Sequence, residues 1–155
     1  MNGEALIILH VEDNPDHSNL IIRTLRKHRV ANQVFLVEDG EAALDFLLRR
    51  GQYADSAKSP RPHLVLLDLR IPKVDGQEVL RVIKTTEELL AIPVVVLTSS
   101  ETEKDITEAY EHHANSYLVK PVGFEAFTEM MECLGFYWLG WNLHPWECHV
   151  RGNNE

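Results

Sequence analysis

Several features that define whole classes of protein are scarce or missing in this chain of 155 residues. Its two cysteines, Cys133 and Cys148, are too few for a disulfide scaffold and suit a reducing compartment. No apolar run approaches the roughly 20 residues that a membrane-spanning helix needs. The start, Met1-Asn2-Gly3-Glu4, lacks the basic residues of a signal peptide. We therefore expect a soluble protein of the cytoplasm.

Positive charge is also in short supply. The chain has 15 Lys and Arg residues against 24 Asp and Glu residues, a formal net charge of −9. Binding along a nucleic-acid backbone or to an anionic membrane needs a basic surface, so neither partner is expected. A glycine-rich phosphate loop is missing too, because the turn after the first apolar run reads Glu12-Asp13-Asn14-Pro15. Its two negative charges would repel a nucleotide.

What the chain does contain is an alternation of two patterns. Short apolar runs rich in β-branched residues are typical of strands buried in a parallel sheet, and two less hydrophobic segments are expected nearer its edges. The buried runs are residues 5–11, 64–67 and 93–97, and the others are 33–37 and 116–119.

Between and after these strands, apolar residues recur at helical spacing. The helical faces are Leu20, Ile21, Thr24 and Leu25; Ala42, Ala43, Phe46 and Leu47; Val79, Leu80, Val82 and Ile83; Ile106, Ala109 and Tyr110; and Phe124, Phe127, Met130, Met131 and Leu134. Five strand–helix units predict one α/β domain over residues 1–138, a doubly wound five-stranded parallel sheet of the (βα)5 kind. Residues 139–155 are expected to form a tryptophan-containing tail without a separate output domain.

Polar residues stand at the point where four of these strands end. In an open parallel sheet, ligands bind at the carboxyl ends of the strands. We therefore expect three carboxylates, a hydroxyl and an ammonium group to converge on one edge of the sheet. They belong to Glu12 and Asp13, Asp68, Thr98 (followed by Ser99 and Ser100), and Lys120.

This set of groups has a specific electrostatic requirement. Three carboxylates in one site repel each other and raise the pKa of at least one member. One Mg²⁺ ion and Lys120 would balance them, and Mg²⁺ prefers carboxylate oxygens, so Glu12, Asp13 and Asp68 are candidate ligands. Asp68 is then a candidate nucleophile toward a phosphoryl group, which would give an aspartyl phosphate. Lys120 and the Thr98 hydroxyl would stabilise the phosphoryl oxygens.

The motifs around these residues resemble those of the receiver domain of bacterial two-component response regulators, which has a CheY-like, flavodoxin-like fold. The similarity covers residues 5 to about 138, and in its details the chain is most similar to the stand-alone regulators that serve cyanobacterial phytochromes. The similarity to the regulators that serve cyanobacterial phytochromes lies in the loop after Phe46–Gly51 and in residues 64–80. The general motifs are Val11-Glu12-Asp13-Asn14, Leu66-Leu67-Asp68-Leu69, Ile71-Pro72-Lys73-Val74-Asp75-Gly76, Val96-Leu97-Thr98-Ser99 and Tyr117-Leu118-Val119-Lys120-Pro121.

The resemblance implies a phosphorylation switch. A sensor histidine kinase, of the phytochrome type given the similarity to those regulators, would pass a phosphoryl group to Asp68, with Mg²⁺ bound by Asp13, Asp68 and the backbone carbonyl of Arg70. Thr98 and Tyr117 would then move and remodel the fourth helix, fifth strand and fifth helix for a downstream protein that the sequence does not identify. The resemblance also implies a cis Lys120–Pro121 bond. Apart from phosphotransfer to itself and autodephosphorylation at Asp68, no enzyme activity is implied.

Three residues beside the phosphoacceptor bear on the lifetime of the phosphoryl group. Arg70 is bulky and cationic and stands two residues after Asp68, so it can reach that group. Ser99 and Ser100 have two interpretations that remain open. They either leave the phosphoryl site accessible to water or only form a polar loop before the next helix.

Other positions favour structural interpretations. Asp75 is expected to cap the helix that follows it. His10, within the first apolar run, is expected to be a core histidine with its hydrogen bonds satisfied. The polar segment 49–62 is expected to be a surface insertion, which an open loop tolerates at little entropic cost.

The aromatic residues of the tail allow two interpretations. Phe136 and Trp138 can complete the core while the rest covers it, or Phe136, Trp138, Trp141 and Trp146 can anchor a dimer or partner surface, where tryptophan is enriched. The second is favoured, because receivers commonly associate through the fifth helix, and it predicts a homodimer.

Two other functions compete with the phosphorylation switch. A haloacid-dehalogenase-type phosphatase also uses an aspartate nucleophile, but it needs a second aspartate where this chain has Arg70. A docking module that works without phosphorylation would keep only the fold, and the intact set of Asp13, Asp68, Thr98 and Lys120 argues against it.

Overall fold

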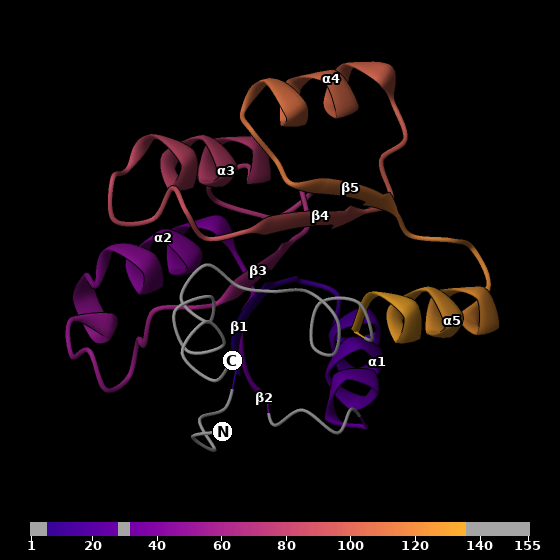
Figure 1. The fold of residues 1–155 in the computed structure, drawn as a ribbon, viewed down its shortest axis with the longest axis horizontal. Coiled ribbons are helices and arrows are strands. Elements are labelled where there is room, and N and C mark those ends of the chain that lie inside the picture. The colour runs from indigo at the N-terminus through magenta and orange to yellow at the C-terminus, as the bar shows by residue number, and fades with distance from the viewer. Residues whose placement is uncertain (1–5, 28–31, 136–155) are drawn as a thin grey trace, which may run out of the picture.

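Five strands alternate with five α-helices along the chain (Figure 1). The structure, a computed structural model, describes residues 6–27 and 32–135. Its elements are β1 (Leu6–Val11), α1 (Pro15–Arg26), β2 (Asn32–Val37), α2 (Gly40–Leu48), the short 3₁₀ helix η1 (Gly51–Tyr53), β3 (Leu64–Leu67), α3 (Gly76–Thr85), β4 (Val94–Thr98), α4 (Glu103–Glu111), β5 (Ser116–Val119) and α5 (Phe124–Gly135).

The strands form one parallel sheet in the order β2-β1-β3-β4-β5. Because β1 lies between β2 and β3, the chain winds outward in both directions from the middle of the sheet. Helices α1 and α5 lie together on one face, and α2, α3 and α4 cover the other (Figure 1). The predicted doubly wound (βα)5 fold is confirmed.

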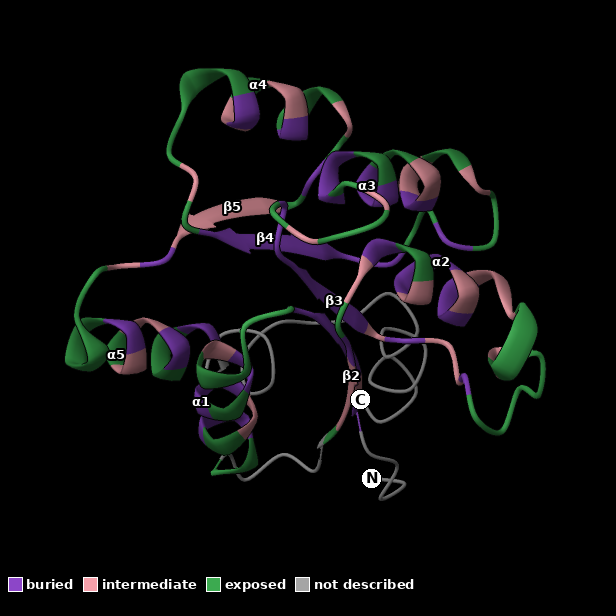
Figure 2. Cartoon of the chain, turned by 180° about the vertical axis from the view of Figure 1, so that it is seen from behind, coloured by how far each residue is buried: buried purple, intermediate pink, exposed green. Residues whose placement is uncertain are grey.

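Each face of the sheet has its own hydrophobic core. Alternating side chains of β1 point to opposite faces, as the pleat of a strand requires: Leu9 packs with the residues of α2 and α3, and Ile8 packs with those of α1 and α5. The strands β3 and β4 are buried along their whole length, whereas β5 at the edge is only partly buried (Figure 2). The two-sided burial explains why the sequence of the central strands is apolar without alternation.

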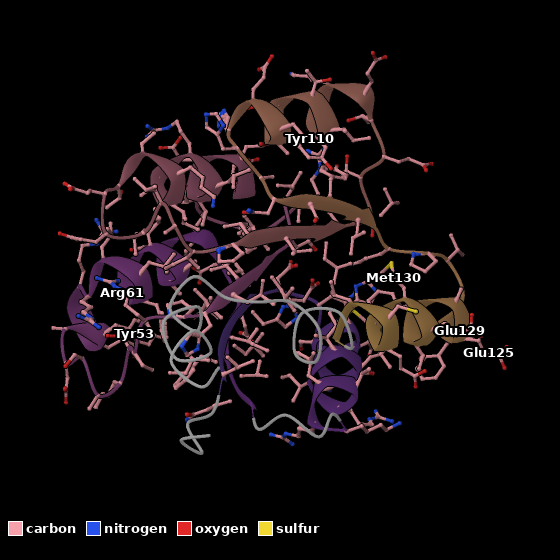
Figure 3. All side chains as sticks on the ribbon, viewed as in Figure 1. Tyr53, Arg61, Tyr110, Glu125, Glu129 and Met130 are labelled. Atoms are coloured by element: carbon pink, nitrogen blue, oxygen red, sulfur yellow. The ribbon has the colours of Figure 1, made fainter. Side chains whose placement is uncertain are left out.

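Three residues of the predicted helical faces are not in the core. Tyr110 is 50% exposed in the last turn of α4, and Phe124 is 69% exposed at the first position of α5. Ile106 in the middle of α4 is only partly buried. Side chains of α4 are seen in Figure 3, where Tyr110 is labelled; the buried residues of this helix are only Asp105 and Ala109. The periodicity identifies the buried faces of α1, α2 and α3 and is less accurate for α4 and for the start of α5.

The helices that begin at the carboxyl edge of the sheet are fixed by capping side chains. Asn14, Asp75 and Thr102 each accept a hydrogen bond from a backbone N–H in the first turn of α1, α3 and α4, which satisfies donors that have no partner within the helix. The expected cap at Asp75 is confirmed. Gly76 packs so tightly that a Cβ atom would lie 2.6 Å from the Asp68 carbonyl oxygen, so α3 is pressed against the loop after β3.

The segment 49–62 is attached to the domain in spite of its polar sequence. Its buried Ser59 donates a hydrogen bond to the carbonyl of Tyr53 (2.8 Å), and Arg61 donates one to the carbonyl of Leu47 (2.5 Å). The Tyr53 ring packs edge-on against Phe46 of α2, with centroids 5.3 Å apart. Figure 3 shows Tyr53 and Arg61 beside α2, away from α4 and α5. This insertion is a surface segment, mostly exposed, that is anchored to α2.

The predicted tail residues Phe136, Trp138, Trp141 and Trp146 lie outside the described residues, as does the expected domain boundary at residue 138. Within the part of the chain that the structure describes, no helix has the length and apolar character needed to cross a membrane.

Candidate functional site

The register of the sheet brings the polar strand ends together. Val11 pairs with Leu67, Leu67 with Val96, and Thr98 with Val119. The residues at and just after these pairs therefore lie side by side at the carboxyl edge, as the sequence predicts. Four of them are buried: Glu12, Asp68, Thr98 and Lys120.

Lys120 joins the two buried carboxylates. Its ammonium nitrogen lies 2.7 Å from Glu12 Oε2 and 3.0 Å from Asp68 Oδ2. The ammonium side chain is only 3% exposed, so both ion pairs are shielded from water. Removing one partner of such a pair is strongly destabilising, because it leaves a buried charge without compensation.

A third carboxylate completes an acidic cluster on the open side of this pair. Carboxylate oxygens of Glu12, Asp13 and Asp68 lie within 4.8 Å of one another, and Asp13 is exposed to solvent. These are hard oxygen donors with one member accessible from water, which fits a divalent cation that keeps part of its hydration shell.

The pKa values show that the two buried carboxylates differ. Burial raises the pKa of Glu12 to about 7, although Lys120 opposes this rise. Burial also acts to raise the pKa of Asp68, but the charge of Lys120 and the hydrogen bond from the Arg70 N–H outweigh it and lower the pKa below its ordinary value. Asp68 is therefore ionised at neutral pH.

His17 belongs to this cluster, and the sequence analysis missed it. Its Nδ1 atom lies 3.0 Å from the Lys120 ammonium nitrogen and 3.6 Å from Glu12 Oε1, while its ring stacks on Phe127 of α5. An ammonium group only donates hydrogen bonds, so Nδ1 accepts, in agreement with the lowered pKa that burial gives this histidine. The signal in the sequence is its spacing, because His17 precedes Leu20 by three residues on the buried face of α1.

Thr98 and Tyr117 are linked through one loop residue. The Tyr117 hydroxyl donates a hydrogen bond to the carbonyl oxygen of Ser100 (2.7 Å), and the Ser100 N–H donates one to the Thr98 hydroxyl (3.4 Å). Ser100 is partly buried, whereas the neighbouring Ser99 is exposed. The two serines that the sequence treats alike are therefore different: Ser100 connects the site to β5, and Ser99 faces solvent.

The Arg70 side chain points to α4. Its backbone N–H donates a hydrogen bond to Asp68 Oδ1 (3.1 Å), but its guanidinium group is paired with Asp105 Oδ2 in the first turn of α4 (2.5 Å). The Arg70 side chain is 62% exposed. The predicted contact between this guanidinium and a phosphoryl group would require it to change partner.

Two further expectations concern His10 and the Lys120–Pro121 bond. His10 is buried, and burial lowers its pKa to about 4, although a hydrogen bond with the backbone of Leu66 opposes this fall. The Lys120–Pro121 bond is trans, since the described residues contain no cis peptide bond; trans is the isomer of lower energy for a bond before proline as well.

The five-stranded order, together with a buried lysine and an acidic cluster at the carboxyl edge, defines a receiver domain. Residues 8–132 match the family model described as the response regulator receiver domain, and the chain belongs to this family.

Particular relatives narrow this assignment. The chain is 46% identical over 142 residues to the probable methanogenesis regulatory protein FilR2 of Methanothrix harundinacea, covering 92% of this chain and 89% of that protein. It is 41% identical over 133 residues to the response regulator Rcp1 of Synechocystis, covering 86% of this chain and 88% of Rcp1.

Solved structures agree with the sequence relatives. The Mn²⁺-bound form of Rcp1 superposes with a TM-score of 0.86 at 40% identity, over 90% of this chain and 99% of that one. The phosphorylated cyanobacterial phytochrome response regulator RcpA superposes with a TM-score of 0.87 at 37% identity, over 92% of this chain and 99% of that one. The resemblance to phytochrome-type response regulators is confirmed.

Proposed function

We propose that this receiver domain is a phosphorylation switch that accepts a phosphoryl group from a histidine kinase on Asp68. The observation that carries the proposal is the pair of ion contacts from the buried Lys120 to Glu12 and Asp68, beside the fully buried Thr98. An ionised carboxylate with an adjacent cation and hydroxyl is equipped to attack phosphorus and to stabilise the oxygens of the product.

The transfer step follows from this geometry. An Asp68 carboxylate oxygen attacks phosphorus, the bond between phosphorus and the kinase imidazole breaks, and its electron pair returns to the imidazole nitrogen. The lowered pKa of Asp68 keeps the nucleophile ionised. Lys120 neutralises charge on the transferred group and the Thr98 hydroxyl donates a hydrogen bond to it, and autodephosphorylation at Asp68 returns the protein to its starting state.

The proposed cofactor is Mg²⁺, held by Glu12, Asp13, Asp68 and the backbone carbonyl of Arg70. When bound, the ion neutralises negative charge on the carboxylates and on the phosphoryl oxygens. The acidic cluster supports this assignment, because the three carboxylates of Glu12, Asp13 and Asp68 carry more negative charge than the ion-pairing Lys120 can balance. The solved Mn²⁺-bound form of Rcp1 is a precedent for a divalent ion in a relative.

The output that we propose is a change in the surface of α4, β5 and α5. Thr98 and Tyr117 are connected through Ser100, so a movement of Thr98 toward a phosphoryl group would disturb the hydrogen bond that holds the Tyr117 hydroxyl. The partners proposed are a phytochrome-like histidine kinase, a downstream protein and a second copy of the chain. The relation to the phytochrome response regulator RcpA supports the first of these.

The test is intact-protein mass spectrometry after incubation with acetyl phosphate, with and without Mg²⁺. The wild-type protein should gain one phosphoryl group only when Mg²⁺ is present, and Asp68→Asn should gain none. Asp45→Asn, which removes a partly exposed carboxylate from α2, is the matched control and should label like the wild type. Labelling of Asp68→Asn would overturn the site, and absence of labelling in every protein would favour a docking module that works without phosphorylation.

A further inference from the structure

Asp105 stands at a junction of three segments around the phosphoacceptor. One of its carboxylate oxygens accepts hydrogen bonds from the Arg70 guanidinium, in the loop after β3, and from the Ser100 hydroxyl, in the loop after β4. Its own backbone carbonyl accepts a hydrogen bond from Gln77 of α3 (3.0 Å). The first turn of α4 is therefore tied to both loops that border the site.

The Asp105 carboxylate and its partner, the Arg70 guanidinium, differ in how far they are exposed to solvent. The Asp105 carboxylate forms an ion pair with the Arg70 guanidinium. Its own side chain is 12% exposed, whereas that of Arg70 is 62% exposed. Of the two, only the arginine is free to move into solvent.

Arg70 is also attached to the phosphoacceptor through its backbone. The N–H of Arg70 donates to Asp68 Oδ1, so the base of this side chain stays beside Asp68 wherever its guanidinium lies. A guanidinium binds phosphate oxygens as well as it binds a carboxylate. Both possible partners, Asp105 and a group on Asp68, are anions that flank the same loop.

We propose that Asp105 is a positioning residue, which holds the Arg70 guanidinium at α4 in the resting protein and competes for it with a phosphoryl group on Asp68. Phosphorylation then transfers the guanidinium from Asp105 to the phosphoryl oxygens. The first turn of α4 loses its tie to the loop after β3, and Asp105 keeps its hydrogen bond from the Ser100 hydroxyl. This inference rests on the proposed function, because it requires a phosphoryl group on Asp68.

The experiment measures how tightly each protein binds beryllium fluoride, which forms a phosphoryl-like adduct on aspartate carboxylates. Asp105→Asn removes the competing charge and keeps the shape of the side chain, so the adduct should form about threefold more tightly than in the wild type, the size expected for one exposed ion pair. Glu103→Gln removes a charge from the same turn of α4 without touching Arg70 and should bind like the wild type.

Repeating the Asp105→Asn substitution in a protein that already carries Arg70→Ala shows whether the effect depends on Arg70. In Arg70→Ala, Asp105→Asn should no longer change the affinity, because the guanidinium for which the two anions compete is gone. A role of Asp105 in the stability of α4 alone would give the same gain in both backgrounds, and that result would overturn the inference. Equal affinity of wild type and Asp105→Asn would overturn it as well.

The same titration separates this inference from the proposed function. If the wild-type protein forms no adduct, or if Asp68→Asn forms one, the phosphorylation site itself is wrong. If the adduct forms on Asp68 and only the Asp105 effect is missing, the phosphorylation site stands and the competition is refuted.

Discussion

Asp68, the residue that we propose as the phosphoacceptor, has a cationic side chain on each side, and the two are built differently. On the inner side, Lys120 is 3% exposed and lies between Glu12, Asp68 and His17. On the outer side, Arg70 is 62% exposed and is paired with Asp105. Both are pairs of opposite charge next to the same carboxylate, but only the inner pair is shut off from water.

This difference in burial gives the two pairs different properties. Separating a buried pair leaves a desolvated charge and is strongly unfavourable, whereas an exposed pair is worth little because water replaces the lost partner. The inner pair is therefore suited to a fixed part of the site, and the outer pair to a part that exchanges partners. The two pairs therefore differ in their degree of burial more than in their charge.

The largest expected effect is on the inner side. Lys120→Met keeps most of the side-chain volume but leaves Glu12 and Asp68 buried without their cation, so the free energy of unfolding should fall by about 3 kcal/mol. Arg70→Met is the matched variant on the outer side and should lower it by less than about 1 kcal/mol. Urea unfolding at neutral pH without divalent ions measures both. Similar losses in the two variants would refute the comparison.

A somewhat smaller effect concerns pH and His10. Its pKa is lowered from 6.5 to about 4 in the folded protein, so between these values the unfolded chain binds more protons and stability falls as the pH falls. For this residue alone, the loss from pH 6.5 to pH 5 should be roughly 2 kcal/mol.

Urea unfolding at several pH values tests this effect by difference. The curve of His10→Leu subtracted from that of the wild type should slope in the stated direction. The subtraction removes the opposite contribution of Glu12, whose raised pKa favours the folded state as the pH falls below about 7. Parallel curves for the two proteins would show that His10 does not titrate as a buried group.

The smallest expected effect concerns the solvent-exposed member of the acidic cluster, Asp13. Mg²⁺ should stabilise the wild-type protein by binding the acidic cluster, and Asp13→Asn should remove about 1 kcal/mol of that gain while leaving the metal-free protein unchanged, because Asp13 is exposed. Asp16→Asn, an exposed carboxylate in the first turn of α1, is the control. Thermal unfolding with and without Mg²⁺ measures this stabilisation. If Mg²⁺ stabilised the wild type and both variants equally, Asp13 would be excluded as a ligand.

The sequence predicts the fold and the inner side well. Strands buried on both faces have uninterrupted apolar runs, and the first polar residue after each run lies at the carboxyl edge, which is why Asp68 and Lys120 could be placed without coordinates. Glu12 lies beside Asp68 because β1 and β3 pair in parallel, Val11 with Leu67.

The outer side could not be predicted in the same way. Nothing in the spacing of Arg70 and Asp105, 35 residues apart, indicates that they meet, because the direction of an exposed side chain depends on loop geometry and not on periodicity. Tyr110 and Phe124 fail for a related reason: periodicity gives the side of a helix that faces the sheet but not how far the sheet extends beneath it.

The position of β1 between β2 and β3 also affects how the chain reaches its native state. Its partner β2 begins 26 residues after it, since Leu6 pairs with Asn32, but its other partner is much more distant, since Ile8 pairs with Leu64. Closing the longer loop costs more entropy, and topologies dominated by distant pairings fold slowly. The first half of the chain can form β1, α1 and β2 early, but its Glu12 meets Asp68 only when β3 has joined, and Lys120 only when β5 has followed. The cluster that we propose for phosphoryl transfer is therefore among the last parts of the domain to assemble.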